Sequence, residues 1–136
     1  PRGGTCRYHL VVKIDKRSEG EPKNIIMGAF GAHYDLKQVV VVDQDVNIDD
    51  PYDVEWAVAT RFQADRDLIV VAGAQGSKLD PSAATDGVSA KMGLDATRPV
   101  KVEAMAYKRI ETVGEGDLAT ALQSDGSAVL RRWLAS

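Results

Sequence analysis

The sequence feature that most constrains the fold is a run of four valines, Val39 to Val42, followed closely by a helix start. An unbroken run of β-branched residues is typical of a strand that is buried on both faces, and so of a parallel or mixed sheet covered by helices. The segment Asp49-Asp50-Pro51 favours a helix start, because Asp50 can accept from free N–H groups and proline is tolerated at the first helical position. Together these signals predict an α/β fold.

The segments before the valine run and after the helix start also have the patterns of helices and strands. Apolar residues at helical spacing predict a helix from Pro51 to Phe62, and a second apolar run, Leu68 to Val71, follows it. Strand, helix and strand in this order predict a right-handed βαβ crossover. An earlier strand at Arg7 to Ile14 and a helix that ends at Gly31 predict a second crossover.

Length and composition exclude several classes of protein. A chain of 136 residues is expected to form one domain, and its formal net charge of −3, without a basic cluster, makes nucleic acid a poor partner. No apolar run approaches the roughly 18 residues of a membrane-spanning helix, so we expect no membrane segment and a cytoplasmic location. The single cysteine, Cys6, cannot form an internal disulfide, and no cluster of cysteines and histidines predicts a metal site.

A long segment of small and polar residues follows the second apolar run. Residues from Gly73 to Gly87 are rich in turn formers and predict a loop that is longer than most connections in compact domains. Long loops on a rigid scaffold often carry function, so this loop is a candidate binding element. A strand from Val88 to Leu94, which contains Lys91, is expected after it.

The acidic residues after the valine run have two interpretations. Asp43 and Asp45 follow the predicted strand at its carboxyl end, where open α/β sheets place ligands and where paired carboxylates can bind a divalent cation. Alternatively, they only solvate a turn and favour the start of the next helix. A group of charges at the end of that helix predicts ion pairs rather than catalysis: Arg61, Asp65, Arg66 and Asp67.

No nucleophile and base stand at a spacing that predicts catalysis. His9 lies within a predicted strand, where a lone histidine is more often packed or hydrogen-bonded than catalytic. Lys91 has no neighbouring base or electrophile in the sequence. The residues alone therefore predict an α/β domain with a long candidate binding loop.

Four motifs in order carry a resemblance to a known family. They are Val40–Asn47, Trp56–Arg61, Leu79–Ser82 and Lys91–Thr97. Together they resemble the C-terminal domain of the UbiD family, whose members are reversible decarboxylases of aromatic and unsaturated acids that use prenylated flavin mononucleotide. The resemblance covers nearly the whole chain.

The resemblance implies a three-layer α/β/α sandwich with a mixed or mostly parallel sheet, formed by residues 1–136 as one domain. Such a domain packs on a catalytic domain or larger subunit and contributes to homo-oligomers. The flavin, the divalent metal and the Glu-Arg-Glu catalytic set of the family lie in preceding domains, so neither a cofactor nor a catalytic residue is expected in this chain, which should be inactive alone. In relatives the loop that matches residues 73–87 reaches the substrate pocket, and its matching positions here are Ser77 and Leu79.

Two other functions remain open. The chain is alternatively a self-standing metal- or nucleotide-binding module that uses Asp43 and Asp45. A third possibility is a pure dimerisation module, since residues from Ser127 to Leu134 form a short amphipathic pattern that needs a docking surface.

Overall fold

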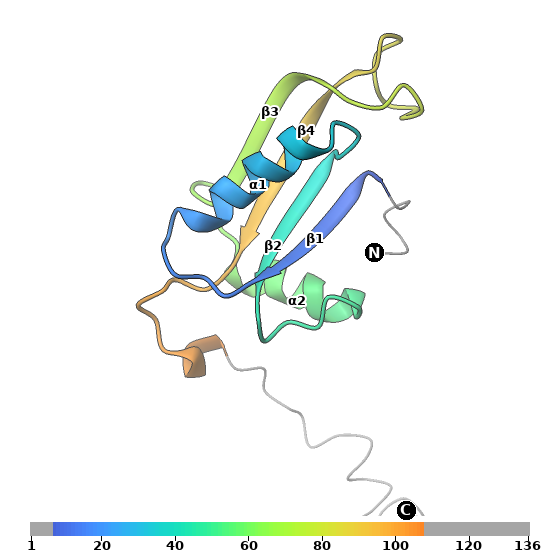
Figure 1. Ribbon diagram of the computed structural model, residues 1–136. Coiled ribbons are helices and arrows are strands. Elements are labelled where there is room, and N and C mark those ends of the chain that lie inside the picture. The colour runs from blue at the N-terminus through green and yellow to red at the C-terminus, as the bar shows by residue number, and fades with distance from the viewer. Residues whose placement is uncertain (1–6, 108–136) are drawn as a thin grey trace, which may run out of the picture.

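The computed structural model describes residues 7–107, which form four strands, two α-helices and one short 3₁₀ helix (Figure 1). Cys6 and the predicted helix at 127–134 lie outside the described residues. In chain order the elements are β1 (His9–Ile14), α1 (Glu21–Ala32), β2 (Gln38–Asp43), α2 (Pro51–Arg61), β3 (Leu68–Gln75), β4 (Val88–Ala96) and η2 (Ala104–Tyr107).

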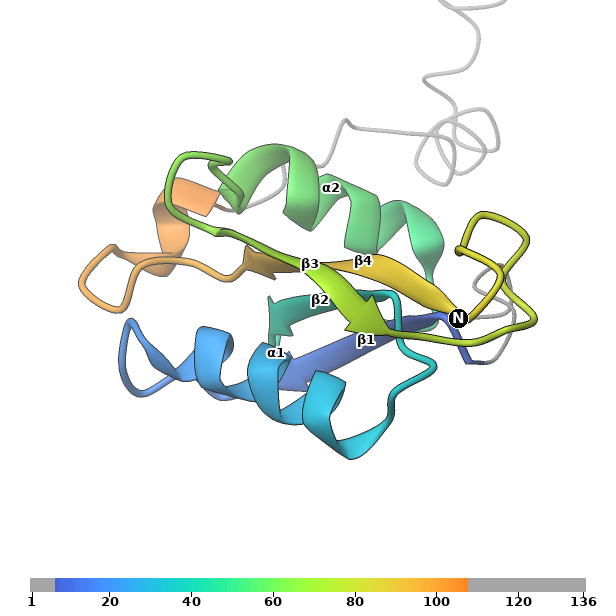
Figure 2. The same ribbon diagram turned by 90° about the horizontal axis from the view of Figure 1, so that it is seen from above.

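The strands form one mixed sheet in the order β1-β2-β4-β3. Strand β2 is parallel to both of its neighbours, β1 and β4, whereas β3 is antiparallel to β4. Helices α1 and α2 cover opposite faces of this sheet (Figure 2). The predicted three-layer α/β/α fold with a mixed sheet is therefore confirmed. Within residues 7–107, neither helix has the length and apolarity to cross a membrane.

The four valines of β2 form the centre of the core, as their sequence predicts. Val39 and Val41 pack with Ile26 of α1 on one face of the sheet, while Val40 and Val42 pack with Ala57 of α2 on the other. All four valines are at most 2% exposed. Alternating side chains of one strand thus bury apolar surface under both helices.

Helix α1 approaches β4 closely at Gly93. A methyl group at this position would overlap Cγ2 of Ile26, which is fully buried in the α1 face of the core. Glycine therefore sets the distance between this helix and the sheet.

Helix α2 begins as its sequence predicts. The Asp50 carboxylate accepts a hydrogen bond from the Tyr52 N–H at 3.0 Å, and Pro51 occupies the first helical position. The Asp53 carboxylate accepts from the Asn47 N–H at 2.6 Å, which fixes the entry to the helix.

Two predictions about β3 are wrong. The segment from β2 through α2 to β3 is not a parallel crossover, because β3 pairs antiparallel with β4 and β4 takes the place beside β2. Residues 73–75 are also strand rather than loop: β3 continues to Gln75 past a register shift, and Gly73, with a φ of 64°, supplies the conformation that this irregularity needs.

Candidate functional site

The loop between β3 and β4, residues 76–87, closes upon itself at one end of the sheet (Figure 1). The Gly76 N–H donates to the Gly87 carbonyl at 2.9 Å, which holds the two ends of the loop together. Gly87 has a φ of 87°, and a side chain there would meet the Gly76 carbonyl oxygen at 3.1 Å. The loop is therefore a closed extension of the β3–β4 pair rather than a slack connection.

Hydrogen bonds within the loop hold Leu79 outward. The Ser77 hydroxyl accepts from the Leu79 N–H at 3.3 Å, and the Ser77 carbonyl accepts from the Asp80 N–H at 3.1 Å. The Asp80 carboxylate accepts from both the N–H and the hydroxyl of Ser82, at 3.0 and 2.8 Å. Leu79 lies between these turns and is 72% exposed, so a large apolar side chain is displayed on an ordered backbone.

An ion pair joins the loop to the start of β2. The Lys37 ammonium contacts the Asp80 carboxylate at 2.8 Å and also donates to the Ser82 hydroxyl. The Lys37 N–H donates to the Tyr8 carbonyl at 2.9 Å, which fixes the backbone that carries the ammonium. Contact with Lys37, followed by the hydrogen bonds from Ser82, lowers the pKa of Asp80 to about 2. The Asp80 carboxylate therefore stays ionised throughout the neutral range.

A cavity of about 410 Å³ lies between this loop and the starts of β1 and β2. Both residues predicted from the resemblance, Ser77 and Leu79, line it, although Ser77 is buried and Leu79 is exposed. The structure thus brings the two predicted site residues to one cavity, together with groups that the sequence analysis did not consider. The complete lining is Arg7, Tyr34, Asp35, Gln75, Gly76, Ser77, Lys78 and Leu79.

Asp35 is the most unusual group in this cavity. Its residue is 9% exposed, and its Oδ1 atom has no hydrogen-bond partner among the described residues. Its Oδ2 atom lies 3.6 Å from a terminal nitrogen of Arg7. Asp35 is not predictable from the sequence, because it stands in a short helix-to-strand connection without a recognisable motif.

Lys91 fixes the connection that carries Asp35. From β4 its ammonium donates to the carbonyls of Tyr34 and Leu36, at 2.5 and 2.6 Å, and lies 5.7 Å from the ring centre of Phe30. Burial lowers the pKa of Lys91, and the charge of Asp35 acts in the opposite direction. Lys91 is thus a structural cation, consistent with the absence of a neighbouring base in the sequence.

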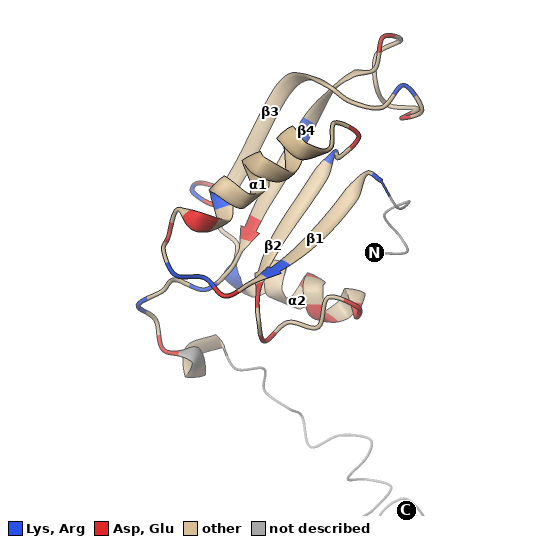
Figure 3. Ribbon diagram, in the orientation of Figure 1, with Lys and Arg blue, Asp and Glu red and all other residues tan. Residues whose placement is uncertain are grey.

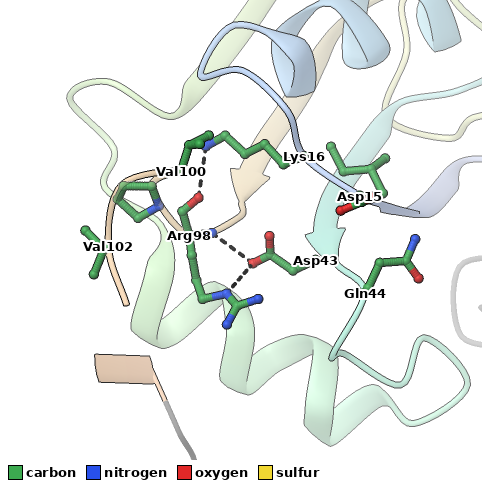
Figure 4. Close-up of a pocket in the computed structure, with 9 residues that line it drawn as sticks. Asp15, Lys16, Asp43, Gln44, Arg98, Val100 and Val102 are labelled. Atoms are coloured by element: carbon green, nitrogen blue, oxygen red, sulfur yellow. Dashed lines mark hydrogen bonds and ion pairs between the residues drawn. The ribbon is translucent and has the colours of Figure 1, made fainter. Parts of the chain in front are cut away.

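A second, smaller crevice lies at the opposite end of the sheet, at the carboxyl ends of β1 and β2 (Figure 4). Its volume is about 180 Å³. The chain leaves β1 for a helix on one face and β2 for a helix on the other, so this is the position at which open α/β sheets commonly bind ligands. Its polar lining includes Asp15, Lys16, Asp43, Gln44 and Arg98.

The carboxylates at this end are occupied by guanidinium groups. Arg61, whose side chain is 1% exposed, contacts Asp43 at 2.7 Å and Asp45 at 2.9 Å. The N–H and the Nε of Arg98 donate to the same Asp43 oxygen, at 2.8 and 3.3 Å. Hydrogen bonds from Arg61 lower the pKa of Asp45. Within residues 7–107 no group of three or more potential metal ligands occurs.

This arrangement favours a structural role for the acidic turn. The predicted ion-pair cluster at the end of α2 is present only in part: Arg66 lies 3.6 Å from Asp67. Arg61 instead pairs with Asp43 and Asp45, and it lies 5.3 Å from the ring centre of Trp56. His9 is half-buried; burial lowers its pKa, and its Nε2 atom has no partner among the described residues. Neither the Arg61 cluster nor His9 provides a nucleophile paired with a base.

The described residues do not fit a flavin phosphate. The connection from β1 to α1 is charged, and the connection from β2 to α2 is acidic, so neither provides the glycine-rich turn at a helix start that binds a phosphate. A flavin, if present in the protein, must be held by other residues.

The fold and the cavity define a class: a three-layer α/β/α domain whose strand-connecting loop walls a ligand-sized cavity. Residues 1–96 match the family described as the 3-octaprenyl-4-hydroxybenzoate carboxy-lyase C-terminal domain. Since this match covers more than half of the chain, the chain belongs to the UbiD C-terminal domain family.

Relatives and solved structures agree with this assignment. The chain is 59% identical over 101 residues to the anhydromevalonate phosphate decarboxylase of Aeropyrum pernix, covering 74% of this chain and 23% of that protein. It is 40% identical over 111 residues to the gallate decarboxylase of Lactiplantibacillus plantarum, covering 73% and 23%. The UbiD-class enzyme HmfF from Pelotomaculum thermopropionicum, solved with FMN, is 51% identical with a TM-score of 0.78, covering 88% of this chain and 27% of that one. The chain therefore spans about a quarter of the length of these relatives.

Proposed function

We propose that this chain is the C-terminal accessory domain of a prenylated-flavin decarboxylase of aromatic or unsaturated carboxylic acids, and that loop 76–87 forms part of its substrate pocket wall. The observation that carries the proposal is the cavity beneath the loop, which Ser77 and Leu79 share. Leu79 then limits the space beside the substrate, while Ser77 offers one hydroxyl. Neither residue transfers a proton.

Several findings support the wider setting of this proposal. Arg7, which stands just before β1, lines the same cavity. Relatives bind flavins: HmfF is solved with FMN, and an evolved dimeric form of it with prFMN. By analogy the full protein carries the flavin, a divalent metal and the catalytic residues in other domains, assembles as a homo-oligomer and resides in the cytoplasm.

The experiment uses the full-length protein that contains this chain, loaded with prenylated flavin. Anhydromevalonate phosphate and gallate, the acids named by the relatives, are offered together with bulkier analogues. Leu79→Ala should raise kcat/KM for bulkier acids, and Leu79→Trp should lower it for all of them. Met105→Ala is the matched control, because Met105 is an exposed apolar residue outside the cavity.

Two outcomes contradict the proposal. If both Leu79 variants keep the same kcat/KM for small and for bulkier acids, the loop does not form part of the pocket wall. Failure of the loaded protein to release carbon dioxide from any of these acids would remove the decarboxylase assignment.

A further inference from the structure

A buried carboxylate with an unpaired oxygen calls for a hydrogen-bond donor. The Asp35 Oδ1 atom is buried in the wall of the 410 Å³ cavity and has no partner among the described residues. Leaving a buried acceptor of this kind unsatisfied is unfavourable, so such groups in native proteins commonly mark a ligand, an ion or an ordered water.

The surroundings of Asp35 limit what this donor can be. Two cations already flank the carboxylate: Arg7 at 3.6 Å, and Lys91, which is held by the carbonyls on either side of Asp35. A third cation would be repelled by these two, and an anionic atom facing Oδ1 would be repelled by the carboxylate itself. A neutral O–H group satisfies the oxygen without either conflict.

Other groups of the cavity can bind further oxygen atoms of a ligand that donates its O–H to Asp35. The Ser77 hydroxyl oxygen accepts from the Leu79 N–H, which leaves its own proton free for a ligand oxygen. The Arg7 side chain is 45% exposed, and its ion pair with Asp35 is its only polar contact within residues 7–107, so it retains N–H groups for an anion. Leu79 supplies an apolar edge.

We propose that Asp35 is a specificity-determining residue that accepts a hydrogen bond from an acidic O–H group of the substrate, at the end remote from the reacting carboxylate. The O–H group belongs either to a phenol or to the singly protonated form of a phosphate monoester, whose charged oxygens then face Arg7, and both chemistries occur in substrates that the relatives' names give. This inference rests on the proposed function, because it places the substrate in the same cavity.

The test measures both binding and turnover in the full-length, flavin-loaded protein. Gallate is compared with 3,4,5-trimethoxybenzoate, and anhydromevalonate phosphate with its dephosphorylated form. The unmodified protein should prefer the O–H member of at least one pair by about 100-fold or more in kcat/KM, as expected where a site binds a polar group specifically. Asp35→Ala should reduce that preference at least tenfold, chiefly through KM.

Two further variants separate recognition from folding. Asp35→Asn keeps the shape and one acceptor oxygen, so it should retain part of the preference even if the alanine variant folds poorly. Asp65→Ala removes an exposed acid from the turn before β3, away from the cavity, and should leave the preference unchanged. A general loss of stability would lower the rates for both members of a pair equally.

The outcomes distinguish this inference from the proposed function. If Asp35→Ala reduces the preference in the gallate pair alone, the group bound is a phenol. If it reduces the preference in the phosphate pair alone, the group bound is a phosphate monoester. Either result supports the role of Asp35. An unchanged preference in Asp35→Ala, with decarboxylation intact, overturns it and leaves the proposed function standing. Titration calorimetry can also show that the protein binds the O–H member of a pair more tightly and that Asp35→Ala abolishes this difference. If no carbon dioxide is released in the same protein, this result supports the role of Asp35 and removes the decarboxylase assignment. Equal binding of both members of each pair overturns the inference.

Discussion

At the residue scale, charged side chains join segments that are distant in sequence. Arg61 joins α2 to the end of β2, Lys37 joins the start of β2 to loop 76–87, and Lys91 joins β4 to the α1–β2 connection. These charges gather at the two ends of the sheet, while β3 carries none along its length (Figure 3). Each bond fixes the position of a connection rather than of a strand.

Removal of Arg61 should destabilise the domain strongly. Arg61→Leu leaves the buried Asp43 carboxylate with Arg98 as its remaining ion-pair partner, so we expect a loss of about 3 kcal/mol in the free energy of unfolding, measured by urea denaturation. Arg66→Leu is the control, because its side chain is 63% exposed and should change stability by less than about 0.5 kcal/mol. Equal effects of the two variants would contradict the importance of the buried pair.

The pKa of Asp80 should depend on Lys37. Its folded value of about 2 lies below the ordinary 3.8, so the ionised carboxylate stabilises the folded state above about pH 4, and this contribution is lost as the pH falls through 2. Lys37→Met should raise the pKa toward 3.8, as followed by carbon-13 NMR of the carboxyl group. Ser82→Ala should raise it less, since Lys37 is the larger cause. A pKa that stays near 2 in Lys37→Met would refute this assignment.

At the element scale, the sequence predicts which helices and strands exist better than it predicts which strands pair with each other. The valines of β2, the Asp50 cap of α2 and the β1–α1–β2 crossover are local patterns, and all three predictions are confirmed. The partner of β3 depends on which strand lies beside β2, and no local pattern decides this. For the same reason no local pattern predicts the pairing of Arg61 with Asp43, or the Asp35 oxygen that has no partner within residues 7–107.

Two glycine substitutions should have opposite effects on α1 and its packing. Gly93→Ala forces Ile26 or the helix to move, and we expect a loss of about 1–3 kcal/mol, as for other overpacked cores. Gly28→Ala lies on the open face of α1, with no atom within 4 Å of the new methyl group, and should stabilise by about 0.5–1 kcal/mol. Thermal unfolding of both variants checks the prediction, and destabilisation by Gly28→Ala would contradict it.

At the scale of the whole molecule, part of the sheet lacks a cover among the described residues. Val70 of β3 and Met92 of β4 pair directly and are 61% and 37% exposed. They lie beyond the Leu68–Leu94 pair, on the face that α2 covers further along. Exposed apolar side chains grouped on a sheet commonly mark a contact surface. Since the chain spans about a quarter of the length of its relatives, we propose that another part of the full-length protein covers this surface.

A charge on this surface should weaken the full-length protein. Val70→Lys changes an exposed residue of this domain, yet in the complete protein it should lower the temperature of thermal unfolding by several degrees, because the lysine would be buried at a domain contact. Ala59→Lys on the exposed side of α2 is the control and should have little effect. If the two variants unfold at the same temperature, the surface is not a contact.

Because the Gly76 N–H and the Gly87 carbonyl meet at 2.9 Å, the ten residues between them enter and leave the fold at a single point. Their sequence and length can therefore change without altering the register of the strands below. Under the proposed function, a family built on this framework can acquire new substrates by exchanging one short segment, and a protein engineer can transplant the same segment between relatives.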